Sequence, residues 1–86
     1  MNIIVMIYGS ILEQQVYKSK KKEIKISNNE IVVSLKENAS LLELLKILGI
    51  SEQGGLMHLI NGKVSHFDNK LCEGDKIEIF LLVDGG

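Results

Sequence analysis

The last two residues of the sequence, Gly85 and Gly86, suggest chemistry that needs no side chain. Glycine adopts backbone conformations that are closed to other residues. A terminal carboxylate that follows two glycines can therefore pass through a narrow channel to a buried reactive atom. At about 3.3–3.6 Å per residue, the chain after Val83 extends roughly 10 Å. Taken alone, these residues also fit an ordinary frayed chain end.

Three side chains, Cys72, His58 and His66, are the other candidates for chemistry. A lone cysteine forms no internal disulfide and no metal cluster. Nothing nearby in the sequence lowers its pKa, so we expect Cys72 to pack as a small apolar residue. Two histidines without a third ligand make a poor zinc site, and we expect surface or hydrogen-bonded histidines. The sequence thus predicts no metal site and no cofactor bound by this chain.

Length and composition predict one small domain that spans residues 1–86. The chain has 86 residues, of which 45% are hydrophobic, and a net charge of −1. This charge favours no nucleic-acid partner. No apolar run is long enough to cross a membrane, and the apolar start is too short for a signal peptide. We therefore expect a cytoplasmic protein without a membrane partner. The basic run at residues 18–22 is interpreted as a solvated loop, with a docking patch for an acidic partner as the alternative.

The first half of the chain is typical of strands, followed by one clear helix. Residues 3–8 are apolar on both faces, as in a central strand. A short helix is predicted over residues 10–16. Residues 23–27 and 30–36 form two strands, or one bent strand. Ser40 and Glu43 have capping-box spacing and Gly49 suits a left-handed cap, so a helix is expected over residues 41–48. Its buried stripe should include Leu44, Leu45 and Leu48, packed against the first strand at positions such as Val5 and Ile7.

The second half predicts a hairpin and a final strand. Asn61-Gly62 favours a type I′ turn between strands at 56–60 and 63–67. A second turn at 73–75 leads to a last strand at 76–83. The order of elements indicates an α+β fold, a mixed sheet with one main helix on one face. The first and last strands are the most apolar, so they should form a central, parallel pair.

One side of the last strand is predicted to bind partners. Side chains alternate along a strand, so Phe80 and Leu82 share one face and Ile77 and Ile79 share the other. If the helix covers the second set, Phe80 and Leu82 form an exposed apolar patch beside the tail. The alternative is that the segment from residue 10 to 17 covers this patch.

Four of these features, in this order, resemble the β-grasp sulfur carriers of the MoaD/ThiS type, which are relatives of ubiquitin. They are the capped helix at residues 40–45, the hairpin at residues 60–63, the turn at residues 73–77 and the terminal Gly85-Gly86. Phe80 also stands where many members have an aromatic residue before the tail. The resemblance covers residues 30–86 well, and residues 1–9 match a first strand. Two prolines that molybdopterin-synthase small subunits often carry before the tail are replaced by Leu81-Leu82.

The resemblance implies a β-grasp fold with a flexible Gly-Gly tail and a carrier role rather than an enzyme activity. An adenylating enzyme related to ubiquitin-activating enzymes would use ATP to convert the Gly86 carboxylate to an acyl-adenylate. A persulfide would then replace AMP and leave a thiocarboxylate, while Gly85 keeps the path through the enzyme clear. The acceptor would be an enzyme such as a molybdopterin synthase large subunit or a thiazole synthase, and the free carrier would be a monomer.

The sequence is compatible with more than one hypothesis about function. The molybdopterin type is preferred to the thiamine type because the segment after Gly9 is longer than in compact thiamine-type members; the chain would then be the small subunit of molybdopterin synthase. One alternative is a ubiquitin-like modifier that is conjugated through Gly86. Another is a non-catalytic β-grasp interaction domain.

Overall fold

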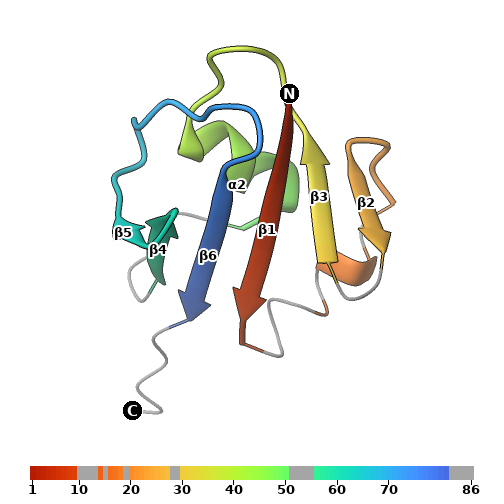
Figure 1. Ribbon diagram of the computed structural model, residues 1–86. Coiled ribbons are helices and arrows are strands. Elements are labelled where there is room, and N and C mark those ends of the chain that lie inside the picture. The colour runs from red at the N-terminus through yellow and green to blue at the C-terminus, as the bar shows by residue number, and fades with distance from the viewer. Residues whose placement is uncertain (10–13, 15, 19, 28–29, 51–55, 82–86) are drawn as a thin grey trace.

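The fold consists of one mixed sheet with a helix on one of its faces. The computed structural model describes residues 1–9, 14, 16–18, 20–27, 30–50 and 56–81 (Figure 1). Its strands are β1 (Asn2–Tyr8), β2 (Ile24–Ser27), β3 (Glu30–Ser34), β4 (Leu56–Ile60), β5 (Lys63–Val64) and β6 (Lys76–Leu81). Helix α2 (Leu41–Leu48) lies behind the sheet in Figure 1. None of the helices in the described residues is long and apolar enough to cross a membrane.

The first and last strands occupy the centre of the sheet. The strand order is β2-β3-β1-β6-β4-β5, and β1 runs parallel to β6. Their register runs from the pair Ile4 and Lys76 to the pair Tyr8 and Phe80. The remaining neighbours are antiparallel. The predicted parallel central pair is therefore confirmed. A parallel pairing is possible because the chain between the two strands is long enough for a crossover connection.

Both pairs of strands form; β4 has its predicted bounds, whereas β2, β3 and β5 are shorter than predicted. Strands β2 and β3 are separate, and their turn residues 28–29 lie outside the described residues. Asn61 (φ 51°) and Gly62 (φ 86°) both have positive φ, as a type I′ turn requires. The returning strand stops at Val64 instead of residue 67. It stops because the N–H of His66 donates to the side chain of Asn69 (2.7 Å) and not to a neighbouring strand.

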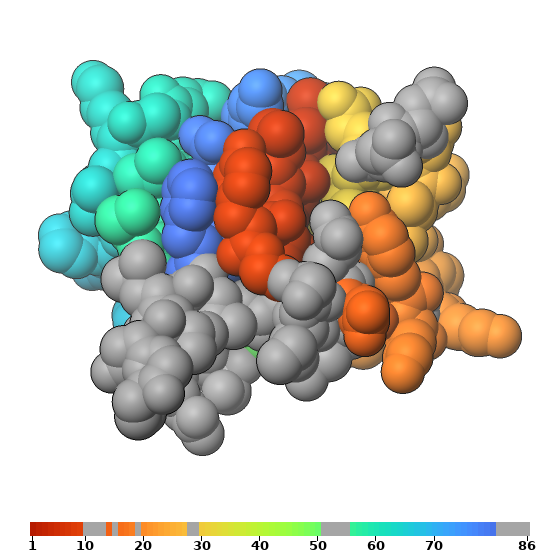
Figure 2. All heavy atoms as spheres, turned by 90° about the horizontal axis from the view of Figure 1, so that it is seen from below, coloured from red at the N-terminus to blue at the C-terminus, as the bar shows by residue number. Residues whose placement is uncertain are grey.

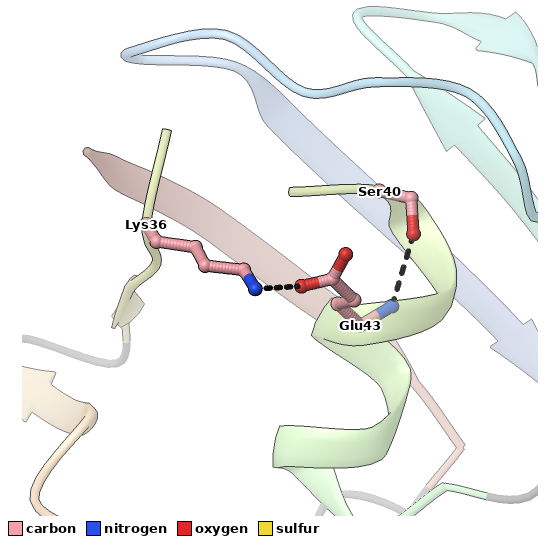
Figure 3. Close-up of polar contacts among 3 residues, drawn as sticks. All are labelled: Lys36, Ser40 and Glu43. Atoms are coloured by element: carbon pink, nitrogen blue, oxygen red, sulfur yellow. Dashed lines mark hydrogen bonds and ion pairs between the residues drawn. The ribbon is translucent and has the colours of Figure 1, made fainter. Parts of the chain in front are cut away.

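Helix α2 begins and ends where the sequence predicts, but only half of its capping box forms. The Ser40 hydroxyl accepts a hydrogen bond from the Glu43 N–H at 3.4 Å (Figure 3). The Glu43 carboxylate does not reach back to Ser40; it lies 3.7 Å from the Lys36 ammonium. Gly49, with φ 78°, closes the helix in the left-handed conformation and donates to the carbonyl of Lys46.

The core fills the space between α2 and the sheet. The helix residues Leu44, Leu45 and Leu48 are at most 2% exposed. They belong to one cluster with Val5 and Ile7 of β1, as predicted. The same cluster contains buried residues of β3 and β6, namely Ile31, Val33, Ile77 and Ile79. The sheet therefore has one buried face and one face that points away from α2.

The segment between β1 and β2 differs from its predicted form. Residues 14 and 16–18 are helical, so the helix expected over 10–16 extends further, while residues 10–13 and 15 lie outside the described part. Within the basic run, Lys18 is helical, and Lys21 is exposed in a non-helical segment but has a specific contact within the chain. The Lys21 ammonium donates to the backbone carbonyls of Ile47 (2.8 Å) and Lys46 (3.4 Å). It thereby caps the C-terminal end of α2, where a cation is favoured.

Candidate functional site

The sheet face opposite α2, called the open face below, carries mostly apolar side chains. Figure 1 looks onto this face, with α2 behind it. Alternation along the strands places on it the residues whose neighbours point into the core. Two exposed lysines lie on it near its margin, Lys76 paired with Ile4 and Lys25 paired with Val32. Its central residues are Ile4, Met6 and Tyr8 of β1, Glu78 and Phe80 of β6, Met57 and Leu59 of β4, and Val32 of β3. Except for Tyr8, which is 40% exposed, these residues are partly buried.

Two aromatic rings stack at one end of the open face. Tyr8 and Phe80 are paired residues of the parallel strands. Their ring centroids are 4.4 Å apart and their planes differ by 7°. Figure 2, viewed from this end of the strands, shows β1 and β6 side by side. Because β6 leads directly to residues 82–86, the pair lies at the end of the strand that carries the C-terminus.

A carboxylate lies next to this aromatic pair. The Tyr8 hydroxyl donates a hydrogen bond to the Glu78 carboxylate at 3.1 Å. It also lies 3.9 Å from the sulfur of Met6. The hydrogen bond to Glu78 raises the pKa of Tyr8, and desolvation and the negative charge of Glu78 add to this shift. Tyr8 therefore stays a neutral donor at physiological pH.

The structure places one predicted site residue and leaves three undescribed. Phe80 lies on the open face, as predicted from the alternation in β6. Leu82, Gly85 and Gly86 lie outside the described residues. Tyr8, the partner of Phe80, was missed as a site residue. Tyr8 lies within the strand predicted over residues 3–8, but its contact with Phe80 follows from the parallel register of β1 and β6.

The segment from residue 10 to 17, the alternative cover for Phe80, packs elsewhere where it is described. Val16 is completely buried and belongs to the core cluster between α2 and the sheet. Tyr17 is 40% exposed. In the described part of this segment, the buried side chain thus faces the core side and not the open face.

The other candidates for chemistry lie apart from this face. His58 is buried, with its Nδ1 atom 3.2 Å from the Ser65 carbonyl and its ring tilted against Phe67. His66 is exposed, and so is Cys72, which does not pack as the small core residue that was expected. Among the described residues, no three His, Cys, Asp or Glu side chains gather as a metal site would require.

The hairpin turn and the turn before β6 are joined by hydrogen bonds. The Asn61 amide donates to the Asp75 carboxylate and accepts from the Lys76 N–H, each at 2.9 Å. The second Asp75 oxygen accepts from the Cys72 N–H at 2.8 Å. Two of the sequence features used for the resemblance therefore form a single structural unit. This unit fixes where β6 begins, and so positions Phe80 along the sheet.

This sheet order, with a parallel central pair and one helix across one face, defines a ubiquitin-like β-grasp protein. The sequence over residues 15–86 matches the model of the ThiS family, and the chain belongs to that family.

Solved structures share this fold at low sequence identity. SAMP1 from Haloferax volcanii matches with a TM-score of 0.73 and 14% identity over 100% of both chains. A putative molybdopterin converting factor, subunit 1, from Pyrococcus furiosus matches with a TM-score of 0.70 and 16% identity, over 96% of this chain and 99% of that one. No curated protein sequence matches the chain significantly.

Proposed function

We propose that this chain is a sulfur carrier that acts through the carboxylate of Gly86. A carboxylate oxygen attacks the α-phosphorus of ATP in an adenylating enzyme, which forms the acyl-adenylate and releases pyrophosphate. A persulfide on a sulfur donor displaces AMP, and a second thiol reduces the acyl disulfide and releases the thiocarboxylate. The thiocarboxylate then gives its sulfur to an acceptor enzyme. The carrier provides no catalytic acid, base or metal for these steps.

The observation that carries this proposal is the family match, which extends through Gly85 and Gly86. The open face supports it, because it carries apolar side chains and an aromatic pair, and one ring of that pair, Phe80, belongs to the strand that leads to the tail. A partly exposed apolar surface of this kind is suited to binding a partner. An enzyme that binds Phe80 would hold the start of the tail. We propose that it also contacts Leu82, which follows Phe80 by two positions in the sequence.

We propose the molybdopterin type as the destination of the sulfur, with the thiamine type as the second choice. The long segment after Gly9 supports this order, and one of the similar folds is a putative molybdopterin converting factor. The acceptor would then be a molybdopterin synthase large subunit, and in the thiamine case a thiazole synthase. We place the carrier in the cytoplasm, as a single domain that is monomeric when free.

The test compares the wild-type chain with a chain that lacks Gly86, in ATP–pyrophosphate exchange with the adenylating enzyme of the same organism. Deletion moves the carboxylate back by about 3.5 Å, and a misplacement of about 1 Å already costs about a hundredfold in rate. We expect exchange with the wild type and none with the deletion. Equal exchange by both chains would refute the proposal.

A second candidate function is protein modification through Gly86. Two of the similar solved structures are of small archaeal modifier protein 1 (SAMP1) from Haloferax volcanii, which favours this candidate as the alternative. Intact mass measurement after incubation with the adenylating enzyme and a sulfur source detects the thiocarboxylate. Blotting for lysine-linked adducts detects the modifier function instead.

A further inference from the structure

Among the described residues, one acidic side chain, Glu78, lies among the apolar side chains at the centre of the open face. By register, Glu78 stands between Met6 on β1 and Leu59 on β4. We propose that a basic side chain of the adenylating enzyme pairs with Glu78 when that enzyme covers the open face. The inference rests on the proposed function and adds a specificity determinant to it.

Covering Glu78 is unfavourable unless the partner supplies a new polar contact. The Glu78 side chain is partly buried, and the contact described for its carboxylate is the hydrogen bond from Tyr8. An ionised carboxylate has about four acceptor positions, so the remaining ones are open to water in the free protein. A partner that displaces this water must replace its hydrogen bonds, because a charge buried without a partner is strongly unfavourable. A wholly apolar partner surface would therefore bind poorly here.

No basic side chain of the described residues forms an ion pair with Glu78. Within the described residues, the ion pair that forms is that of Lys36 with Glu43, next to α2. The nearest basic residue along β6 is Lys76, which is exposed and two positions away, about 7 Å along the strand. Tyr8 contributes a neutral hydroxyl. The negative charge of Glu78 thus remains available to a partner.

The Glu78 carboxylate is held in place before any partner binds. The Tyr8 ring is stacked on Phe80, and its hydroxyl is bonded to Glu78. One contact surface therefore combines an apolar anchor with a fixed acceptor. Tyr8 acts as a positioning residue, whereas Glu78 makes the contact. An adenylating enzyme with an acidic or apolar residue at the facing position would be rejected, which gives the carrier a means of choosing its enzyme.

The experiment measures KM for the carrier and kcat in ATP–pyrophosphate exchange with the adenylating enzyme of the same organism. We expect Glu78→Gln to raise KM about tenfold or more, and Glu78→Lys to raise it further, since removal of one partner of a covered charge pair is costly. The value of kcat at saturation should not change, because binding in the ground and transition states is lost equally. Tyr8→Phe keeps the ring and removes the hydroxyl, and should raise KM only a few-fold.

Glu37→Gln is the matched control, because it makes the same change of charge at an exposed position before α2. It should leave KM unchanged. Wild-type KM for Glu78→Gln, or a loss of kcat without a change in KM, would overturn the inference. Loss of exchange on deletion of Gly86 would still support the carrier function in that case. Exchange that survives this deletion would refute the carrier function instead, so the two failures are distinguishable.

Discussion

Replacing Phe80 by alanine tests whether the aromatic pair is a docking surface or a part of the core. Full burial of a phenylalanine contributes about 1.5–3 kcal/mol, and Phe80 is only partly buried. The stack with Tyr8 adds about 0.5–1.5 kcal/mol. Half of the burial contribution plus the stack gives about 2 kcal/mol for Phe80→Ala, below the roughly 3–5 kcal/mol of a core phenylalanine.

Urea unfolding of four chains measures this directly: the wild type, Tyr8→Ala, Phe80→Ala and the double variant. Because the two rings are stacked with their centroids 4.4 Å apart, the double-mutant cycle should give a coupling free energy of about 0.5–1.5 kcal/mol between Tyr8 and Phe80. The same variants should lose most of their binding to the adenylating enzyme. A destabilisation above about 3 kcal/mol would show that Phe80 is a core residue. A coupling of zero would show that the stack does not persist in solution.

Three further predictions concern the core, the tyrosine and the hairpin turn. Leu45 is completely buried, so Leu45→Ala should lower the free energy of unfolding by about 2–5 kcal/mol in urea unfolding, and a loss under about 1 kcal/mol would contradict the packing of α2. In a Tyr17→Phe background, ultraviolet titration should show Tyr8 ionising above its ordinary pKa of 10.0. Because this folded-state pKa is raised, the stability from the Tyr8–Glu78 bond is present at neutral pH and is lost as pH rises through it. Glu78→Gln should return the titration towards 10.0, and an unchanged titration would refute the bond. Gly62 has a φ of 86°, and none of the described residues has an atom within 4 Å of the place that an added Cβ would take. Gly62→Ala should therefore cost about 1–2 kcal/mol from backbone conformation alone, measured by the shift in thermal midpoint; a neutral substitution would contradict the type I′ turn.

The parts of the fold that the sequence predicts well are those that local chemistry determines. Helix α2 was located because Ser40, a leucine stripe and Gly49 all indicate the same boundaries. The hairpin at Asn61-Gly62 follows from the positive φ that its turn requires. The central pairing of β1 with β6 followed from their apolar composition, which suits strands with neighbours on both sides.

The features that were missed depend on contacts between distant parts of the chain. The Glu43 carboxylate pairs with Lys36, and Lys21 caps α2 from a different segment. Neither partner is recognisable from spacing within one element. Cys72 is exposed because the turn around Asp75 uses its backbone N–H and turns the chain at the surface. Residue type alone favoured burial for it.

In the candidate site too, features set by local pattern were predicted, and features set by contacts between distant strands were not. Alternation along β6 predicts that Phe80 faces away from the helix, and the register agrees. The role of Tyr8 needs one more piece of information, the offset between two strands at opposite ends of the chain. Composition and spacing contain no measure of that offset. The proposed role of Glu78 likewise depends on its neighbours Met6 and Leu59, which lie on other strands and are known only from the strand register.

The central position of β6 also has a consequence for how the chain folds during its synthesis. Strand β1 leaves the ribosome before the other strands. Its parallel neighbour β6, which also joins β4 to the sheet, leaves last. Among the described strands, β6 (residues 76–81) is the one that joins the two halves of the sheet, so the core cannot close while these residues are still in the exit tunnel. Contacts between such distant residues slow folding. A chain that stops before β6 therefore lacks the folded open face, and an enzyme that recognises this face would select for chains whose last strand has left the ribosome.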